Sequence, residues 1–230
     1  MVINSAYFGI VVSLIAYEIG LFIYKKIRIP LLNPLLISIV FIIVVLKTLS
    51  IDFAVYNKGA SMISFFLGPA TIALSIPLYS NLNLLKQNFL PIIGGIFAGC
   101  ISSISSVLIL SKWFGLSELI TLSFIPKSVT TPIGMELSSQ LGGNAALTIG
   151  MIVTTGITGA VIGPTVFKLF GIKDHVSVGI AMGTASHAIG TSKAMELGKT
   201  QGAFSGLAIG ISGLITVLIV LIRSIILGLY

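Results

Sequence analysis

Charged residues are scarce in this chain of 230 residues. Only 8% are Asp, Glu, Lys or Arg, whereas soluble domains carry about 25%. More than half of the residues, 56%, are hydrophobic, and the mean hydropathy is +1.13. This composition excludes an ordinary soluble domain. It predicts a multi-pass protein of the lipid bilayer that forms one integral membrane domain over residues 1–230, because no polar stretch is long enough for a separate domain.

Cysteine and histidine are also rare: the chain has one Cys, Cys100, and two His, His175 and His187. A disulfide needs two cysteines, and a metal site needs ligands at a recognisable spacing. The sequence also lacks a nucleophile elbow, a phosphate-binding P-loop and an H-E-x-x-H motif. We therefore expect no enzymatic activity, no cofactor and no bound metal.

Acidic residues are few, with six Asp or Glu against thirteen Lys or Arg. In a soluble protein the formal net charge of +7 would fit nucleic-acid binding. Here the basic residues lie mostly at the ends of hydrophobic runs, as Lys25, Lys26 and Arg28 do. That pattern fits positively charged cytoplasmic loops and anionic lipid headgroups, so we expect no nucleic-acid partner.

Long hydrophobic runs fill the rest of the sequence and predict an all-α fold. Because about 20 apolar residues in a helix cross a bilayer, the chain is predicted to have about seven or eight transmembrane segments. A short linker with Asp52 and Lys58 is expected between the second and the third. The predicted segments are residues 4–24, 30–47, 60–79, 89–111, 144–170, 179–198 and 202–228, with residues 116–140 ambiguous.

Residues 119–137 either cross the membrane or enter and leave it on the same side. Pro126 and Pro132 each remove a helical hydrogen bond, and the residues between them are polar. With the N-terminus outside, a crossing segment leaves five basic residues on the cytoplasmic side and six on the other. A re-entrant segment changes this count to seven against four. Because cytoplasmic loops are enriched in Lys and Arg, the re-entrant alternative is favoured.

The segment at residues 179–198 is long enough to cross a bilayer but too polar and too glycine-rich to face lipid. Such a segment is tolerated where protein buries it or where it lines a water-filled cavity. Polar and ionisable groups at membrane depth usually mark the path of a substrate or ion. Gly183 and Gly190 predict that this helix is broken. The segment therefore indicates membrane transport.

A second broken helix is predicted in the third segment, at Gly68 and Pro69. If residues 119–137 are re-entrant, the two broken helices run in opposite directions through the membrane. This arrangement is typical of secondary transporters built from an inverted repeat. The repeat halves would be residues 1–115 and 116–230.

The segment Pro126-Lys127-Ser128-Val129-Thr130-Thr131-Pro132 carries the sharpest local signal. An ammonium group at membrane depth is costly unless it is paired or solvated. Surrounding hydroxyls and free backbone N–H groups would form a cradle suited to a carboxylate, which makes Lys127, Ser128, Thr130 and Thr131 candidate binding residues. In the alternative, Lys127 reaches the membrane interface and Ser128 caps a helix.

Three side chains of residues 179–198, those of Ser186, His187 and Thr191, are candidates for binding or proton transfer. Thr184, His187 and Thr191 share one helical face at spacings of three and four, and Ser186 adjoins them. His187 either exchanges a proton near neutral pH or stays neutral and bonds to a backbone carbonyl.

The charged pair of the same segment, Lys193 and Glu196, lies three residues apart, so we expect the two to form a local salt bridge. Glu196 and His187 are the candidates for proton coupling.

The third segment contributes Thr71, which follows Gly68 and Pro69. A break at this point would leave backbone groups unpaired, and the N-termini of half-helices attract anions. The alternative is a simple kink without a ligand. Asn33, which precedes Pro34, has a similar but weaker profile as a binding residue.

Four sequence blocks together resemble the LrgB/CidB family of bacterial membrane proteins, in the right order and over nearly the whole chain. The first is Asn33-Pro34-Leu35-Leu36, and the third is the proline-flanked segment around Lys127. The second runs from Phe66-Leu67-Gly68-Pro69-Ala70-Thr71 to Pro77-Leu78-Tyr79, and the fourth is Ser186-His187-Ala188-Ile189-Gly190-Thr191 with Glu196.

The resemblance implies a multi-pass protein of the bacterial plasma membrane that works beside a small LrgA/CidA-like membrane subunit. Related sequences include the plastidial glycolate/glycerate transporter, and bacterial relatives are associated with pyruvate movement. The family has also been called antiholin-like and linked to the control of murein hydrolases and cell lysis.

Two functions follow from these observations. The broken helices, Lys127 and the hydroxyl-rich segments favour a secondary transporter of small monocarboxylates such as pyruvate, glycolate or lactate, with proton coupling as an option. The alternative is an antiholin-like regulator of murein hydrolase activity that acts with a small holin-like partner. A homo-oligomer is compatible with both.

Overall fold

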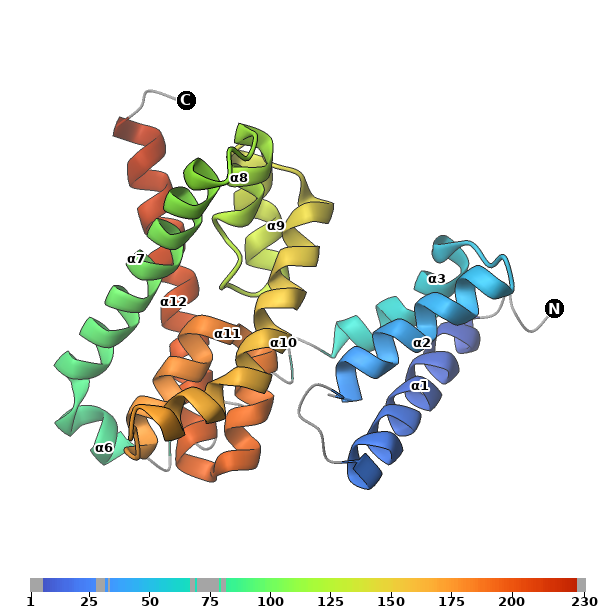
Figure 1. Ribbon diagram of the computed structural model, residues 1–230, viewed down its shortest axis with the longest axis horizontal. Coiled ribbons are helices and arrows are strands. Elements are labelled where there is room, and N and C mark those ends of the chain that lie inside the picture. Colours follow the sequence, from blue (N-terminus) through green and yellow to red (C-terminus); the bar gives the residue numbers. More distant parts are fainter. Residues whose placement is uncertain are drawn as a thin grey trace. The chain divides into compact units, whose positions relative to one another are not determined.

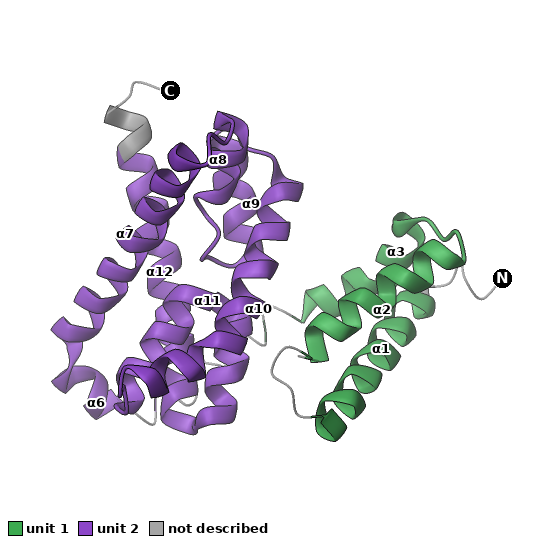
Figure 2. Ribbon diagram, viewed as in Figure 1, with its two compact units in different colours: residues 1–73 green, residues 74–230 purple. Residues whose placement is uncertain are grey.

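The computed structural model describes residues 6–27, 32, 34–66, 69, 79 and 82–226 (Figure 1). Within these ranges the regular structure is entirely helical, which confirms the predicted all-α class. The chain divides into two compact units, unit 1 with residues 1–73 and unit 2 with residues 74–230 (Figure 2). Their boundary falls well before the proposed repeat boundary at 115/116, so the repeat halves stay a prediction.

The described residues of unit 1 form three helices, α1 (Ala6–Ile27), α2 (Pro34–Thr48) and α3 (Phe53–Phe65). Gly20 of α1 allows a close approach of α2, because a Cβ at this position would lie 2.5 Å from the carbonyl oxygen of Pro34. The buried Ser38 donates to the carbonyl oxygens of Pro34 and Ala16, at 2.6 and 3.2 Å. Backbone-to-backbone proximity at a small residue is the usual way in which apolar helices pack in lipid.

The linker between the second and third segments is shorter than predicted, because it covers only residues 49–52. Asp52 instead caps the N-terminus of α3, and its carboxylate accepts a hydrogen bond from the backbone N–H of Ala54 at 2.7 Å. A carboxylate at this position satisfies a free N–H group and favours helix initiation. Lys58 therefore lies within α3 and is exposed.

Unit 2 contains the seven remaining helices of the described residues. Its three longest apolar helices, α7, α10 and α12, each exceed the length needed to cross a bilayer. Two of them agree closely with the predicted segments 89–111 and 144–170. In order the helices are α6 (Leu82–Gln87), α7 (Phe89–Trp113), α8 (Glu118–Phe124), α9 (Thr131–Gln140), α10 (Ala145–Leu169), α11 (His175–Leu197) and α12 (Lys199–Ile226).

The ambiguous residues 116–140 form two short helices rather than one. Pro126 lies just beyond α8, and Pro132 lies in the first turn of α9. The helices have seven and ten residues, or about 10 and 15 Å at 1.5 Å per residue, which is too short to cross a hydrocarbon core of about 30 Å. Between them, Lys127 contacts Ser103 near the middle of α7. The connection therefore passes alongside the middle of α7.

The polar helix α11 is broken, as its composition predicts, but the break lies between the two glycines rather than at them. Ser186 (φ −129°, ψ 15°) and His187 (φ 41°, ψ −136°) leave helical geometry. A Cβ on Gly190 would lie 2.5 Å from the carbonyl oxygen of Met182, eight residues earlier. In a straight helix these residues are about 12 Å apart. The chain therefore folds back, and α11 consists of a first arm (175–185) and a second arm (188–197).

Both arms of α11 pack against α12. Gly179 and Gly183 of the first arm bring the two backbones together, since a Cβ at Gly179 would lie 2.5 Å from the carbonyl oxygen of Gln201. Met195 of the second arm packs against Gly202 in the same way. The glycines act here through packing, because small residues let helices approach closely in lipid.

Large apolar side chains cover the outside of the described helices. Leu90, Trp113 and Leu169 are each 78% to 80% exposed. An apolar surface of this extent is unfavourable in water and matches a lipid environment. Four helices of the described residues are long and apolar enough to cross a membrane: α1, α7, α10 and α12. The shorter α2 is apolar as well.

Candidate functional site

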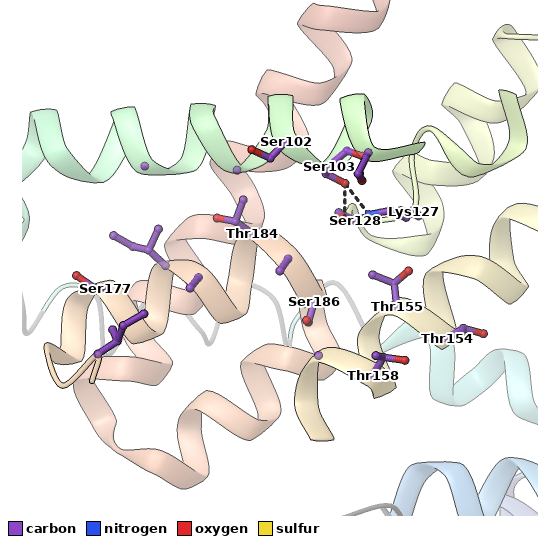
Figure 3. A pocket seen from close by; sticks show the side chains of 18 of the residues that line it. Ser102, Ser103, Lys127, Ser128, Thr154, Thr155, Thr158, Ser177, Thr184 and Ser186 are labelled. Atoms are coloured by element: carbon purple, nitrogen blue, oxygen red, sulfur yellow. Dashed lines mark hydrogen bonds between the residues drawn. The ribbon is translucent and has the colours of Figure 1, made fainter. Parts of the chain in front are cut away.

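A cavity of about 850 Å³ opens in unit 2 (Figure 3). Helices α7, α10 and α11 and the connection between α8 and α9 form its wall. Ten of its twenty lining residues carry a hydroxyl group, and Lys127 is the one charged residue among those described there. No group of three or more His, Cys, Asp or Glu capable of holding a metal ion occurs within the described ranges. The chemistry available is therefore hydrogen bonding plus one positive charge.

Helix α7 presents one continuous small-residue face to the cavity. Gly95, Gly99, Ser102, Ser103 and Ser106 follow one another at helical spacing, so they lie on one side of the helix. Gly99 allows a close approach of α11, because a Cβ there would lie 2.7 Å from the Cγ2 of Thr184, and the serines make the same face polar further along. Ser106 donates to the carbonyl oxygen of Ser103 at 2.7 Å, so its hydroxyl hydrogen is paired within α7.

Lys127 reaches α7 from the connection between α8 and α9. Its Nζ donates to the Oγ of Ser103 at 2.9 Å and to the Oγ of Ser128 at 3.3 Å. The two serine hydroxyls share a further hydrogen bond of 2.8 Å. Dashed lines in Figure 3 mark the bonds of this cluster. The described part of the chain offers this ammonium group hydroxyl oxygens and no carboxylate, so its charge is not neutralised by an ion pair.

Helix α10 supplies the opposite wall through Thr154, Thr155 and Thr158, with Met151 one turn earlier. Thr154 donates to the carbonyl oxygen of Gly150 at 2.8 Å, the usual bond of a threonine within a helix. Its methyl group and those of its neighbours give this wall a mixed polar and apolar character.

The first arm of α11 ends at the cavity, where Thr184 and Ser186 line it. In Figure 3, Thr184 rises from α11 towards α7, and Ser186 lies at the break. Gly159 of α10 makes room for Ser186, whose Oγ occupies the space that a Cβ at residue 159 would need.

His187 belongs to the wall between α10 and α11 rather than to the cavity. Its Nε2–H donates to the carbonyl oxygen of Ile152 at 2.9 Å, which fixes the tautomer because a carbonyl only accepts. The ring is buried, with 3% of the residue exposed. A buried histidine bonded to a backbone carbonyl was one of the two alternatives that the sequence left open.

Comparison with known proteins identifies the family of this chain. The model of the LrgB-like family matches residues 13–225 of the chain. The chain belongs to the LrgB family. Proteins named "Antiholin-like protein LrgB" from Bacillus cereus and Bacillus anthracis are 38% identical over 217 residues, which cover 94% of this chain and of each relative. No solved structure is detectably similar to it.

In this LrgB-family chain, three of the predicted site residues meet at the cavity: Lys127, Ser128 and Ser186. Thr130 lies at the N-cap of α9 and Thr131 begins that helix, and neither lines the cavity. The turn between Pro126 and Thr130 points Lys127 and Ser128 inward but leaves the threonines to start a helix. Fewer hydroxyl groups of this segment therefore reach the cavity beside Lys127 than the sequence predicts.

Thr191 and Glu196 lie away from the cavity because the chain reverses before them. Thr191 donates to the carbonyl oxygen of His187 at 3.0 Å and shares a bond of 2.7 Å with Ser205 of α12. The shared face with Thr184 is thus lost at the break. Glu196 forms the predicted salt bridge with Lys193, at 2.7 Å, and is 61% exposed.

The candidates in the first half of the chain belong to unit 1. Asn33, Gly68 and Thr71 lie outside the described residues, and Pro69 is exposed. Their predicted role in binding stays a prediction. Gly183 and Gly190 flank the break and pack against α12 and the first arm.

Sequence reasoning missed much of the polar wall, in particular Ser102, Ser103 and Ser106 of α7 and the threonines of α10. A signal existed, since Ser102-Ser103 and Ser105-Ser106 interrupt an otherwise apolar span. Serine and threonine are common in transmembrane helices, where they satisfy their hydroxyls on their own backbone. Their spacing alone does not tell which face meets a cavity.

Proposed function

We propose that this protein is a secondary transporter that moves small organic monocarboxylates, of the pyruvate, glycolate or lactate type, across the plasma membrane. The observation that carries the proposal is the ammonium group of Lys127, held at a hydroxyl-lined cavity without a carboxylate partner in the described structure. A positive charge at membrane depth that no protein group neutralises favours an anionic ligand.

The donors of the Lys127 cluster match the two oxygens of a carboxylate. An ammonium group has three N–H donors, and two are used by Ser103 and Ser128. Of the two serine hydroxyl hydrogens, one is used in the bond between Ser103 and Ser128. One N–H and one O–H therefore remain for a ligand. Hydrogen bonds from a charged donor to a carboxylate are about twice as strong as neutral ones.

The backbone around the cavity supports transport rather than static binding. Irregular backbone occurs at Ser186–His187 and between α8 and α9, and both places adjoin the cavity. Unwound helices beside a binding site are the typical arrangement of secondary transporters. We infer that residues 118–140 form a re-entrant hairpin and that the full chain contains an inverted repeat of seven or eight spans.

Proton coupling would act through His187, whose backbone neighbour Ser186 lines the cavity. The bond from its Nε2 to Ile152 holds the ring beside the break, where a change of charge would act on the reversal of α11. Glu196 is the weaker candidate because it is exposed and paired with Lys193. His187→Ala would then abolish accumulation driven by a pH gradient while leaving exchange at equal pH.

A second function is favoured by the relatives. Their name, antiholin-like protein, fits a regulator of murein hydrolase activity and cell lysis more directly than a carrier. Under this alternative the protein acts with a small holin-like membrane subunit, and the cavity need not bind a solute. Such a regulator would change membrane leakiness only together with its partner.

Uptake into proteoliposomes separates the two functions. Purified protein is reconstituted with and without the small LrgA/CidA-like subunit, and radiolabelled pyruvate, lactate and glycolate are supplied with and without a pH gradient. Saturable uptake that Lys127→Ala abolishes supports the carrier. Non-saturable leakage that requires the partner and is unchanged by Lys127→Ala supports the regulator and contradicts the carrier.

A further inference from the structure

Thr184 carries a buried hydroxyl that the protein leaves unused. The residue is 5% exposed, and its Oγ1 has no hydrogen-bond partner among the described residues. Other helical threonines here donate to the carbonyl four residues earlier, as Thr154 does to Gly150 and Thr191 to His187. A buried hydroxyl without a partner is unfavourable, so its retention needs a reason.

Gly99 sets the position of this side chain. A Cβ at residue 99 would lie 2.7 Å from the Cγ2 of Thr184, so the methyl group occupies space that only glycine leaves free on α7. A β-branched side chain has few allowed χ1 rotamers in a helix. With the methyl group packed against Gly99, the hydroxyl makes no hydrogen bond to the carbonyl groups of its own helix.

Thr184 borders two spaces. It lines the large cavity, and it also lines a void of about 10 Å³ together with Ser103 and Ser128 of the Lys127 cluster. That void has room for about one water molecule. A solute anchored at the cluster thus lies in the same cavity as Thr184, whose buried hydroxyl has no partner among the described residues.

We propose that Thr184 is a specificity-determining binding residue, whose hydroxyl bonds a second oxygen of an anion held by Lys127. The proposal rests on the proposed transport function and adds a requirement to it. Anions with a hydroxyl or oxo group beside the carboxylate are bound in preference to anions of the same skeleton that lack it. A site with a polar group left unpaired discriminates against the analogue that cannot satisfy it.

Lactate and propionate test this directly, because they differ in the 2-hydroxyl alone. Labelled lactate uptake into proteoliposomes is measured, with unlabelled lactate or propionate as competitor, for the wild type, Thr184→Val and Thr184→Ser. Thr121→Val is the matched control, since Thr121 donates to the carbonyl oxygen of Ser117 at 3.0 Å and lies outside the cavity lining.

The expected wild-type preference for lactate over propionate is about tenfold, the equivalent of one hydrogen bond of about 1.4 kcal/mol. Thr184→Val should lose most of this preference, because the apparent affinity for lactate falls while that for propionate is unchanged. Thr184→Ser and Thr121→Val should keep it. Gly99→Ala should reproduce the loss, because its added methyl group displaces the Thr184 side chain.

Three results would overturn the proposal, and they are distinguishable. If Thr184→Val lowers the affinity for both acids equally, the residue shapes the cavity and does not recognise an oxygen. If the substitution changes neither affinity, the hydroxyl binds only a water molecule in the small void. If the wild type transports neither acid, with or without the small partner subunit, the proposed transport function fails, and this inference fails with it.

Discussion

Gly156 and His187 fit against each other across the α10–α11 contact. A Cβ on residue 156 would lie 2.6 Å from Cε1 and 2.9 Å from Nε2 of His187, so the imidazole fills the space that the glycine leaves. The same ring donates to the carbonyl oxygen of Ile152, one turn earlier. His187 also has a positive φ of 41°, which a residue with a side chain adopts only under constraint. The contact therefore stabilises the reversal of α11.

Gly156→Ala is expected to destabilise the protein by about 1–3 kcal/mol, because the ring must move and its buried N–H loses the carbonyl of Ile152. Thermal unfolding in detergent measures the effect. Gly150→Ala on the same helix is the control, since no atom lies within 4 Å of its Cβ position. That variant should be unchanged or slightly more stable. Equal behaviour of the two variants would show that the contact has no energetic role.

Lys127→Gln should reduce the affinity for a monocarboxylate by roughly tenfold to a hundredfold, since a charge-assisted hydrogen bond contributes about 1.5–3 kcal/mol. Equilibrium binding of labelled pyruvate to the purified protein measures this. Lys193→Gln removes a positive charge from the same unit at a salt bridge outside the cavity. The Lys193→Gln variant should bind pyruvate with wild-type affinity, because the lost salt bridge lies outside the cavity and such surface pairs contribute little to stability. A similar loss in both variants would mean that overall charge, not the cavity, attracts the anion.

Thr184→Val should raise the thermal stability of the ligand-free protein, by up to about 1 kcal/mol, because it removes an unsatisfied buried hydroxyl. The stabilising effect would accompany the loss of lactate preference, as is common where a site is kept for function. Thr191→Val should act in the opposite direction, since it breaks bonds to His187 and Ser205. A destabilised Thr184→Val variant would mean that the hydroxyl has a partner within the protein.

Asp174 should make the stability of α11 depend on pH at the acid end. Its carboxylate accepts hydrogen bonds from the side chain and backbone N–H of Ser177, both at 2.7 Å, and these bonds lower its pKa from 3.8. A lowered folded-state pKa gives stability that is present above the unfolded value and is lost as the pH falls through the folded value. The residue is exposed, so the effect is small.

Asp174→Ala tests this through unfolding measured at pH 7 and near pH 3. At neutral pH the variant should be less stable than the wild type by about 1 kcal/mol, the usual contribution of an N-cap side chain. The difference should narrow near pH 3, where the wild-type carboxylate begins to take up protons. A constant difference between the two pH values would assign the effect to the loss of the side chain rather than to its charge.

Local patterns predicted the elements of this fold well. Helices α7 and α10 agree with the hydrophobic runs because about 25 apolar residues have no alternative to helix in lipid. Pro126 and Pro132 bound the short helices α8 and α9, as the loss of their N–H groups requires. The linker after α2 was predicted too long, because a carboxylate that caps a helix, such as Asp52, cannot be told in sequence from one within a longer linker.

The site was predictable only where a residue type is rare. Lys127 was predicted because ammonium groups seldom occur at membrane depth, and Ser128 was predicted because it is the next residue in the sequence. Thr184 and Thr191 were assigned to one face on the assumption of a continuous helix. The reversal at Ser186–His187 separates them, and it depends on Gly156 and Gly159 of another helix, which local spacing does not reveal.

An all-helical LrgB-family membrane protein with a polar, broken helix and an unusual lysine is recognisable from the amino-acid sequence alone. These properties follow from composition and from the need of every backbone group in lipid to be paired. Helix packing, in contrast, selects the hydroxyls that share the cavity with Lys127, directs His187 to α10, and leaves Thr184 without a partner among the described residues. The reason is physical: a hydroxyl in a helix can bond its own backbone or a neighbour, and only the packing of α7, α10 and α11 selects between them.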